Sequence, residues 1–440
     1  MARQFVLVGN GPASLAAAEA IRLCDAQAEI TILGDEPHAF YSRPGLAYYL
    51  AGHIPQSQLY SRPDEEYRRI GARRQTAKAV SLQPREHRLL LQDGRSLSYD
   101  LVLLGVGARA VRPKVTGIDL QGVVTLDTLE DARRIVALAR RARRAVVVGG
   151  GITALELAEG LAARGVETHY LLRRDRYWSN VLDRDESELV EAHLEEEGIR
   201  LHHNTHLTEI LGRRGRVVGV GMAPGGEIAC DIVAVAVGIE PRLELAKAAG
   251  LQVRRGIVVD PYLAASADGV FAAGDVAEVL DPDTGEYVLD SLWWLAIEQG
   301  KAAGSNMAGP RRAYRKGTPF NVTRIGGLTT TILGCVGQPT PDDDLVGIAR
   351  GDSEAWRRQP DAASVEADDE SSRLRVLVGR QHILGGVVMG NQRASRPLQD
   401  LISNRVDVTA VRDRLLSNRE GLFPVIEESW VSWKRGGRVL

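Results

Sequence analysis

The stretch Phe5–Ser14 reads F-V-L-V-G-N-G-P-A-S and runs on into an alanine-rich segment. Its apolar start, Phe5 to Val8, is typical of a buried parallel strand, and Leu15 to Leu23 is predicted to be a helix. Glycines between such elements allow a tight turn and let a pyrophosphate approach the N–H groups that begin the helix. The stretch therefore predicts an α/β unit with a dinucleotide-binding turn. The turn residues are Gly9, Gly11, Pro12, Ala13 and Ser14, with Ser14 where a third glycine or alanine is usual.

A second stretch has the same pattern about 140 residues later. Val146–Glu156 reads V-V-V-G-G-G-I-T-A-L-E. Two strand–turn–helix units indicate two dinucleotide sites in one chain, the alternative being two α/β turns that hold no ligand. The second turn comprises Gly149, Gly150, Gly151 and Ile152, and Ala154 completes G-x-G-x-x-A.

The size and composition of the chain set outer bounds. Its 440 residues predict two or three domains. Hydrophobic residues make up 44%, charged residues 25%, and the net charge is −2. This balance gives no indication of nucleic-acid binding, and no apolar run is long enough for a membrane span or a secretory signal. The three cysteines are scattered, so we expect no redox disulfide, no metal site and a cytoplasmic location.

An acidic pair follows the second predicted strand, Glu29 to Leu33. An acid about 20 residues beyond a glycine turn can accept hydrogen bonds from a ribose. Asp35 is favoured for this role and Glu36 is the alternative, because either carboxylate is correctly spaced. A solvated turn carboxylate remains the other interpretation of both.

The loop after this acid resembles a known family. Residues 34–46 read G-D-E-P-H-A-F-Y-S-R-P-G-L, which is similar to the loop of flavoprotein reductases with two dinucleotide-binding domains. Within them, it resembles most the NAD(P)H-dependent rubredoxin, ferredoxin and nitrite reductases. The resemblance implies that Arg43 contacts FAD. The chain departs from related oxidases at Pro44, where they carry a reactive cysteine, and from ferredoxin reductases at Tyr48, where a lysine is common.

The same resemblance assigns further residues to the FAD site. Residues 269–276 read G-V-F-A-A-G-D-V, similar to the motif whose aspartate binds the ribityl chain of FAD. Two adjacent tryptophans begin a helix that is predicted to reach about residue 308. The resemblance implies that they flank the flavin, and packing in the protein core is an equal alternative. The implied residues are Val80, Gly107, Gly274, Asp275, Trp293 and Trp294.

In the second unit, the resemblance places Glu156 beside the nicotinamide and the flavin, where it orients a ring or relays a proton. Gly238 lies in the turn behind the nicotinamide. The strand Thr168 to Leu172 ends without the acid that would hold an unphosphorylated ribose, and Arg173 and Arg174 follow it. Guanidinium groups suit a 2′-phosphate, so NADPH is predicted, with NADH as the alternative.

The implied architecture is α/β, with two Rossmann-like domains of the glutathione-reductase type and a small α+β domain at the C-terminus. We expect an FAD domain at 1–115 and 245–315, an NAD(P) domain at 116–244 and an interface domain at 316–440. Residues 351–372 are polar and predicted to be a loop, and a hairpin is expected over 374–389. The arginines of the helix predicted at 127–144 are expected on a solvated face.

The implied activity is hydride transfer from NAD(P)H to FAD, with electrons passed to a redox protein or a partner subunit. Two alternatives remain open. One is an oxidase or quinone reductase that serves a small molecule, and the other is a flavoprotein whose redox state gates a protein partner. The sequence names no acceptor and leaves a homodimer open.

Overall fold

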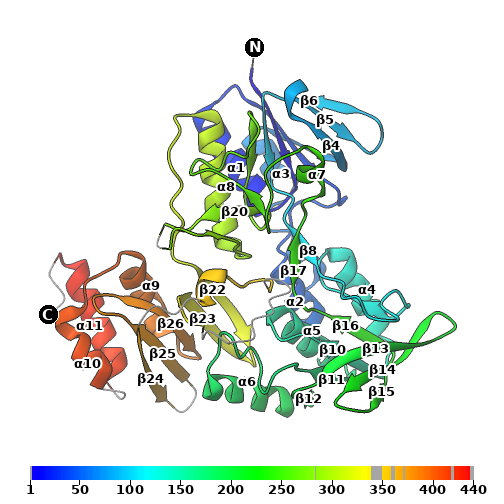
Figure 1. Cartoon of the computed structure of the whole chain (residues 1–440), viewed down its shortest axis with the longest axis vertical. Coiled ribbons are helices and arrows are strands. Elements are labelled where there is room, and N and C mark those ends of the chain that lie inside the picture. The colour runs from blue at the N-terminus through cyan, green and yellow to red at the C-terminus, as the bar shows by residue number, and fades with distance from the viewer. Residues whose placement is uncertain are drawn as a thin grey trace.

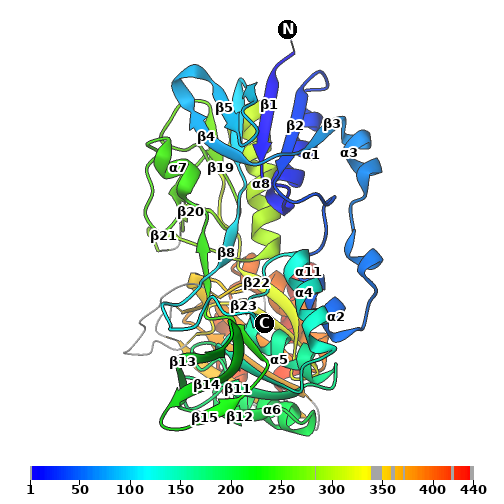
Figure 2. The ribbon, with the colours of Figure 1, turned by 90° about the vertical axis from the view of Figure 1, so that its right-hand side faces the viewer.

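The structure is a computed structural model that describes residues 2–282, 284–337, 349–357, 362–369, 372–417 and 421–436. Three units are visible (Figure 1): one at the top, built mostly from the N-terminal part, and two below it, side by side. The view from the side shows the same division, with α8 reaching down from the upper unit towards the other two (Figure 2).

The upper unit is built on a parallel sheet whose strands lie in the order β19-β7-β1-β2-β3. Val8 at the end of β1 pairs with Leu33 on one side and Leu104 on the other. Four of the strands are mostly apolar because both faces of the sheet are covered there, whereas the edge strand β3 reads A-R-R-Q-T. Their bounds are β1 (Gln4–Val8), β2 (Glu29–Gly34), β3 (Ala72–Thr76), β7 (Leu101–Leu104) and β19 (Val270–Ala272).

Two helices of this unit, α1 (Pro12–Cys24) and α8 (Trp293–Ala308), pack against each other closely. A Cβ atom at Gly300 would lie 2.1 Å from the carbonyl oxygen of Ala13, and one at Gly304 would lie 2.4 Å from that of Ala17. Both distances are far inside van der Waals contact, so only glycine permits this approach. The late segment of the chain is thus locked onto the first dinucleotide-binding helix.

Smaller elements complete the upper unit. Residues 79–98 form a three-stranded antiparallel sheet in the order β4-β5-β6, with Asp93 and Gly94 in the turn between its last two strands. The remaining elements are α3 (Asp64–Ile70), β4 (Ala79–Gln83), β5 (Arg88–Leu91), β6 (Ser96–Ser98), α7 (Glu244–Ala248), β18 (Ile257–Val258), β20 (Ala277–Leu280) and β21 (Tyr287–Val288). The helix α2 (Gly45–Ala51) comes from the same stretch of chain but packs beside α5 in the second unit (Figure 1).

The second unit repeats the plan with a parallel sheet in the order β12-β11-β10-β16-β9. A short antiparallel ribbon, β8 (Ala108–Ala110) with β17 (Ile239–Pro241), connects it to the first unit. Its other elements are β9 (Val123–Val124), α4 (Leu129–Ala139), β10 (Arg144–Val148), α5 (Ile152–Ala162), β11 (Glu167–Leu171), α6 (Arg184–Glu196), β12 (Arg200–His202), β13 (His206–Arg213), β14 (Arg216–Ala223), β15 (Glu227–Ala229) and β16 (Ile232–Val235). Together with the first sheet, this confirms the predicted fold of two Rossmann-like units.

The third unit is an antiparallel sheet in the order β22-β23-β26-β25-β24, with three helices beside it. The prediction of a loop over 351–372 was wrong in part. β24 occupies residues 363–369 of that range, and Val365 and Ala367 point into the core, so an alternating apolar pattern was hidden among acids. Residues 358–361 and 370–371 of the range lie outside the described residues. The elements are β22 (Phe320–Ile325), β23 (Leu328–Gly334), β24 (Ala363–Asp369), β25 (Ser372–Val378), β26 (Ile383–Met389), α9 (Ser395–Ser403), α10 (Arg412–Ser417) and α11 (Leu422–Lys434).

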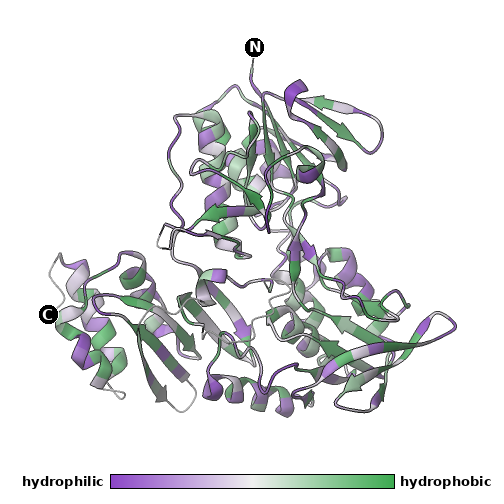
Figure 3. Cartoon of the chain, in the orientation of Figure 1, coloured by the Kyte–Doolittle hydropathy of each residue, from purple (hydrophilic) through white to green (hydrophobic). Residues whose placement is uncertain are grey.

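The two faces of this sheet have different partners. Leu374, Val376 and Val378 of β25 face α9 and α11, whereas Val387 and Met389 of β26 join the core of the second unit. Figure 3 shows the apolar strands of all three sheets lying inside the units. The C-terminal sheet is therefore shared between its own helices and the second dinucleotide-binding unit.

A buried ion pair strengthens this junction. Alternation along β25 turns Arg375 towards the second unit, where its Nε lies 2.8 Å from Oε1 of Glu186 on α6. Both side chains are almost fully buried, and the guanidinium also donates to the carbonyl oxygens of Val181 and Val336. A charge pair satisfied in this way joins the two units directly.

Candidate functional site

The first glycine turn has the geometry that a bound pyrophosphate needs. Gly9 has φ +112°, and a Cβ there would lie 2.1 Å from the carbonyl oxygen of Gly105. Gly11 caps α1, and the place where its Cβ would stand is open. Pro12 follows in the first turn of the helix, where its missing N–H costs nothing. Ala13 and Ser14 are buried against α8 and the β7 end, so their small size serves packing.

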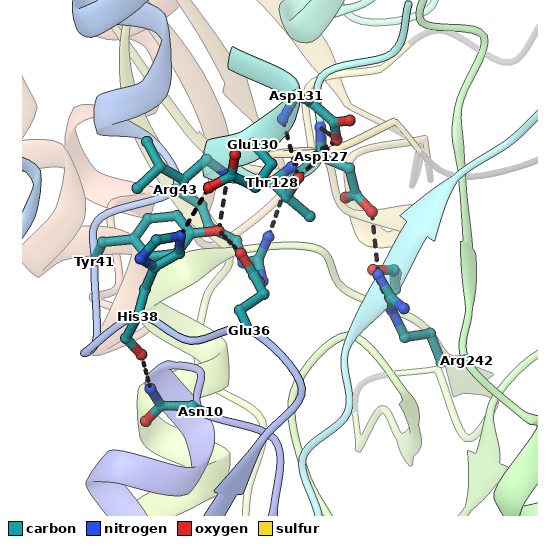
Figure 4. A network of polar contacts seen from close by, with 12 residues as sticks. Asn10, Glu36, His38, Tyr41, Arg43, Asp127, Thr128, Glu130, Asp131 and Arg242 are labelled. Carbon is teal, nitrogen blue, oxygen red and sulfur yellow. Dashed lines mark hydrogen bonds and ion pairs between the residues drawn. The ribbon is translucent and has the colours of Figure 1, made fainter. Parts of the chain in front are cut away.

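The end of β2 carries an ordered polar network (Figure 4). Glu36 accepts a hydrogen bond from Tyr41 at 2.7 Å and forms an ion pair with Arg43 at 2.8 Å. Tyr41 in turn accepts from the backbone N–H of Leu129 at the start of α4. Asp35, the favoured ribose ligand, is exposed beside this network. Of the two predicted acids, the structure thus ties Glu36 into the junction between units and leaves Asp35 at the surface.

Three arginines from distant parts of the chain meet at Asp127. Arg43 donates to its carbonyl oxygen, Arg242 contacts its carboxylate at 3.2 Å, and Arg350 forms an ion pair with the same carboxylate. Sequence reasoning missed Asp127, Arg242 and Arg350. Arg350 belongs to a C-terminal segment, and no local pattern marks it as part of a site in the first 300 residues.

The Gly274-Asp275 motif lies beside the first glycine turn, since a Cβ at Gly274 would lie 3.3 Å from the Cβ of Ala13. Gly274 has φ +80°, and its N–H donates to Gln299 of α8. Burial raises the pKa of the Asp275 carboxyl, whereas the charges of Arg350 and Arg43 lower it, and the net shift is upward. Ser291 donates to this carboxyl at 3.4 Å. A half-buried carboxyl beside the first glycine turn fits the role of holding a polar chain of a bound ligand.

The two tryptophans at the start of α8 have different surroundings. Trp293 packs against Phe40, with ring centroids 5.6 Å apart. Trp294 is 43% exposed. Its ring centroid lies 5.9 Å from that of Phe320, and the ammonium of Lys301 lies over its ring. Trp293 is thus the one enclosed near the turn, while Trp294 lies towards the C-terminal sheet.

The second glycine turn repeats the first and opens into a cavity. Gly149 has φ +149°, and its Cβ would lie 2.2 Å from the carbonyl oxygen of Ala236, whereas Gly150 faces open space. The cavity in front of it has a volume of about 460 Å³ and is lined by all three glycines and by Gly238. Ile152 is buried at the start of α5 and Ala154 behind it.

The cavity is basic where β11 ends. Leu172 is buried there, and Arg173, Arg174 and Arg176 line the wall. Trp178, which also lines the cavity, has φ +47°, an uncommon conformation for a bulky residue. No sequence pattern marked Trp178 or Arg176 as lining residues, because the loop geometry that brings them to the cavity depends on the fold.

Glu156 sits one turn into α5 and does not line that cavity. Burial raises its pKa to about 8, the nearby charge of Glu159 adds to the rise, and Arg350 opposes it. With this pKa, Glu156 can hold or release a proton near neutral pH. A smaller cavity is lined by Gly151, Thr153, Ala349 and Arg350, so the C-terminal segment lies over the second turn.

The remaining predicted residues are placed as follows. Gly107 has φ +66° and Gly238 φ +128°, and each flanks a strand of the connecting ribbon. Val80 is 48% exposed on β4. The cysteines lie in three different units, and none of Cys24, Cys230 and Cys335 forms a disulfide.

Residues 3–301 match the family of pyridine nucleotide-disulphide oxidoreductases. The chain belongs to this family. A probable ferredoxin reductase of Castellaniella defragrans is 31% identical over 416 residues, covering 93% of this chain and 98% of the relative. A rubredoxin-NAD(+) reductase of Ectopseudomonas oleovorans is 32% identical over 308 residues, covering 69% of this chain and 80% of the relative. The structure also has the fold of a ferredoxin reductase from Rhodopseudomonas palustris, with TM-score 0.83, 24% identity and coverage of 94% and 97%.

As a pyridine nucleotide-disulphide oxidoreductase, the chain is an FAD-dependent enzyme that oxidises a reduced nicotinamide coenzyme. Its residues fit both groups, because two glycine turns stand open at helix N-termini and the second has a cavity before it. The flavin, when bound, supplies the means to take a hydride and release electrons singly. No helix in the described part of the chain is long and apolar enough to cross a bilayer.

Proposed function

We propose that this protein oxidises NADPH and passes the electrons through FAD to a small redox protein or partner subunit. The observation that carries the coenzyme choice is the wall of the cavity at the end of β11. Leu172 leaves no carboxylate to repel a 2′-phosphate, and Arg173, Arg174 and Arg176 lie along the same wall. Asp175 in that loop is paired with Arg176 at 3.3 Å and Arg184 at 3.1 Å, so its charge is compensated.

The protein acceptor is supported by the names of the two relatives, a ferredoxin reductase and a rubredoxin reductase. The name of the second relative specifies NAD(+), so NADH is the competing coenzyme. The chain's own arginines favour NADPH, because a guanidinium can donate two parallel hydrogen bonds to a phosphate.

The residues of the site have proposed parts in this reaction. Gly9, Gly11 and the start of α1 hold the FAD pyrophosphate, Asp275 holds its ribityl chain, and Arg43 lies beside it. Gly149 to Gly151 hold the coenzyme pyrophosphate, and Glu156 manages a proton. We also propose a cytoplasmic location, which the absence of disulfides among the three cysteines supports.

The test is rapid-mixing reduction of the flavin with NADPH and with NADH at equal low concentration. We expect NADPH to be faster. Arg173→Ala with Arg174→Ala should raise the KM for NADPH by roughly ten- to a few hundredfold and leave that for NADH nearly unchanged.

The matched control is Arg140→Ala with Arg141→Ala, which removes the same charge from exposed positions beyond α4. It should leave both constants unchanged. A wild-type protein that reacts faster with NADH would overturn the coenzyme assignment. Electron transfer to small quinones or oxygen that outpaces every ferredoxin and rubredoxin offered would overturn the acceptor assignment.

A further inference from the structure

Two carboxyl groups lie on one face of α5. Glu156 and Glu159 are three residues apart, so their side chains are neighbours on the helix surface. Glu156 is the one close enough to Arg350 for that charge to oppose the rise of its pKa. Glu159 accepts hydrogen bonds from the backbone N–H groups of Gly326 and Gly327, at the tip of the β22–β23 hairpin.

The same hairpin tip touches α6. A Cβ at Gly326 would lie 2.9 Å from Cα of Val190, and one at Gly327 would lie 2.4 Å from Nε2 of His193. The imidazole of His193 forms an ion pair at 3.2 Å with Glu197, whose side chain is 40% exposed. The hairpin thus brings Glu159 and the surface pair His193–Glu197 to one place.

Behind the two glutamates lies a group of buried polar atoms without protein partners. The hydroxyls of Tyr170 and Tyr177 and the indole nitrogens of Trp178 and Trp356 have no hydrogen-bond partner among the described residues. An unsatisfied buried polar group costs about 1–3 kcal/mol, so ordered water is the expected partner. Burial first, and then the charges of Tyr170, Glu159 and Glu156, raise the pKa of Tyr177. The two tyrosines therefore adjoin the glutamates.

The electrostatic surroundings of Glu159 come from every element packed on it. Burial raises its pKa to about 7, Glu197 of α6 adds to the rise, and Arg324 of β22 opposes it together with the two glycine N–H groups. Two further ionisable groups are close to Glu159: Glu156 on the same helix and Tyr170 on β11. Both carboxyls therefore change protonation near neutral pH.

The reaction proposed above requires such a route. A hydride carries two electrons and one proton away from C4 of the nicotinamide. A one-electron acceptor protein takes the electrons one at a time, so the balance is NADPH plus two oxidised acceptors giving NADP⁺, two reduced acceptors and one proton. That proton must then pass from the site of hydride transfer to solvent.

We propose that Glu156, Glu159 and the His193–Glu197 pair form a proton exit from the first turns of α5 to solvent, with ordered water beside Tyr170 and Tyr177. This rests on the proposed function. The proton is taken up by the Glu156 carboxylate, passes to Glu159 and leaves through the imidazole and Glu197 to solvent. Glu159 is the relay that the route cannot omit.

The first test is Glu159→Gln in the FAD-loaded protein, with ferricyanide as the one-electron acceptor. Glutamine still accepts the two glycine N–H bonds but carries no titrating proton. Turnover at pH 8 should fall by about tenfold or more, the solvent isotope effect should grow, and added imidazole should restore the rate. The matched control, Glu188→Gln, changes an exposed glutamate of α6 and should behave as wild type.

The second test needs no coenzyme. Infrared difference spectra of the oxidised holoprotein between pH 6 and pH 9 should show two protonated carboxyl bands that disappear with rising pH, and Glu159→Gln should remove one. If that variant keeps wild-type turnover and pH profile, or loses rate without rescue by imidazole, the relay is refuted. A protein that neither coenzyme reduces, yet shows both infrared bands, would contradict the proposed function and leave the acidic pair in place.

Discussion

The two glycine turns are nearly identical in backbone geometry and opposite in their surroundings. Gly9 and Gly149 both have positive φ, and their Cβ atoms would lie 2.1 and 2.2 Å from a carbonyl oxygen. The first turn is then covered by α8, whose Gly300 touches the backbone of α1. The second opens onto a cavity of about 460 Å³.

This difference explains how one repeated motif can serve two kinds of ligand. A turn enclosed by a helix from far along the chain suits a group that stays bound through many turnovers. A turn at the mouth of an open cavity suits a coenzyme that enters and leaves each time. On the proposed assignment, the backbone motif provides the fit for a pyrophosphate, and the packing around it determines how long the ligand remains.

The largest expected effect comes from alanine at each turn. Gly9→Ala and Gly149→Ala should each destabilise the fold by about 4 kcal/mol or more, because the new methyl group meets a fixed carbonyl oxygen. Gly9→Ala should yield protein without flavin, whereas Gly149→Ala should keep flavin and lose its reduction by NADPH. Absorbance at the flavin band and urea unfolding measure both.

The control for this pair is Gly94→Ala. Gly94 has φ +86° but nothing near its Cβ, so only the conformational cost of about 1 kcal/mol applies. If Gly149→Ala removed the flavin as completely as Gly9→Ala, the two turns would not serve different ligands.

Next in size is the effect of pH on stability through the second unit. The pKa of Glu156 is about 8 in the folded protein against an ordinary 4.5. The folded state therefore holds a proton that the unfolded state has lost, so this contribution is complete below pH 4.5 and disappears as pH rises through 8. Between pH 5 and pH 9 the free energy of unfolding should fall by about 2–4 kcal/mol, after discounting for partial solvent access. Glu156→Gln should flatten that decline, and an unchanged slope would contradict it.

A smaller effect is expected at the acid of the first unit. Asp275→Ala should weaken FAD binding by about ten- to a hundredfold, since a charge-assisted hydrogen bond contributes roughly 1.5–3 kcal/mol. Equilibrium dialysis of FAD measures it, with Asp268→Ala at an exposed loop position as the control. Full flavin occupancy in the Asp275 variant would remove this carboxyl from the site.

The smallest effect is predicted for the thiols. Replacing Cys24, Cys230 and Cys335 together by alanine should leave flavin reduction within about twofold of wild type, because they lie in three separate units. A collapse of turnover in a folded triple variant would show that a thiol takes part after all.

Much of this fold could be predicted from local sequence patterns. The glycine turns and the strand ends are determined by neighbours in the chain, and these were predicted from the residues, whereas the Gly274-Asp275 motif was assigned through the family resemblance. The meeting of Arg43, Arg242 and Arg350 at Asp127 was not, because it depends on three long-range connections that leave no periodic trace. Likewise β24 was missed because its two inward residues are surrounded by acids.

The ion pair between Arg375 and Glu186 has a consequence for modularity. The family match ends at residue 301, yet the sheet beyond it supplies Arg375, the buried cation that pairs with Glu186. A chain cut after the match would leave that carboxylate buried without its counter-charge and strip the apolar cover contributed by Trp356 and Met389 from the second unit. The last third of this protein therefore contributes to the core of the second unit. A truncation or domain graft at residue 301 would remove part of that core.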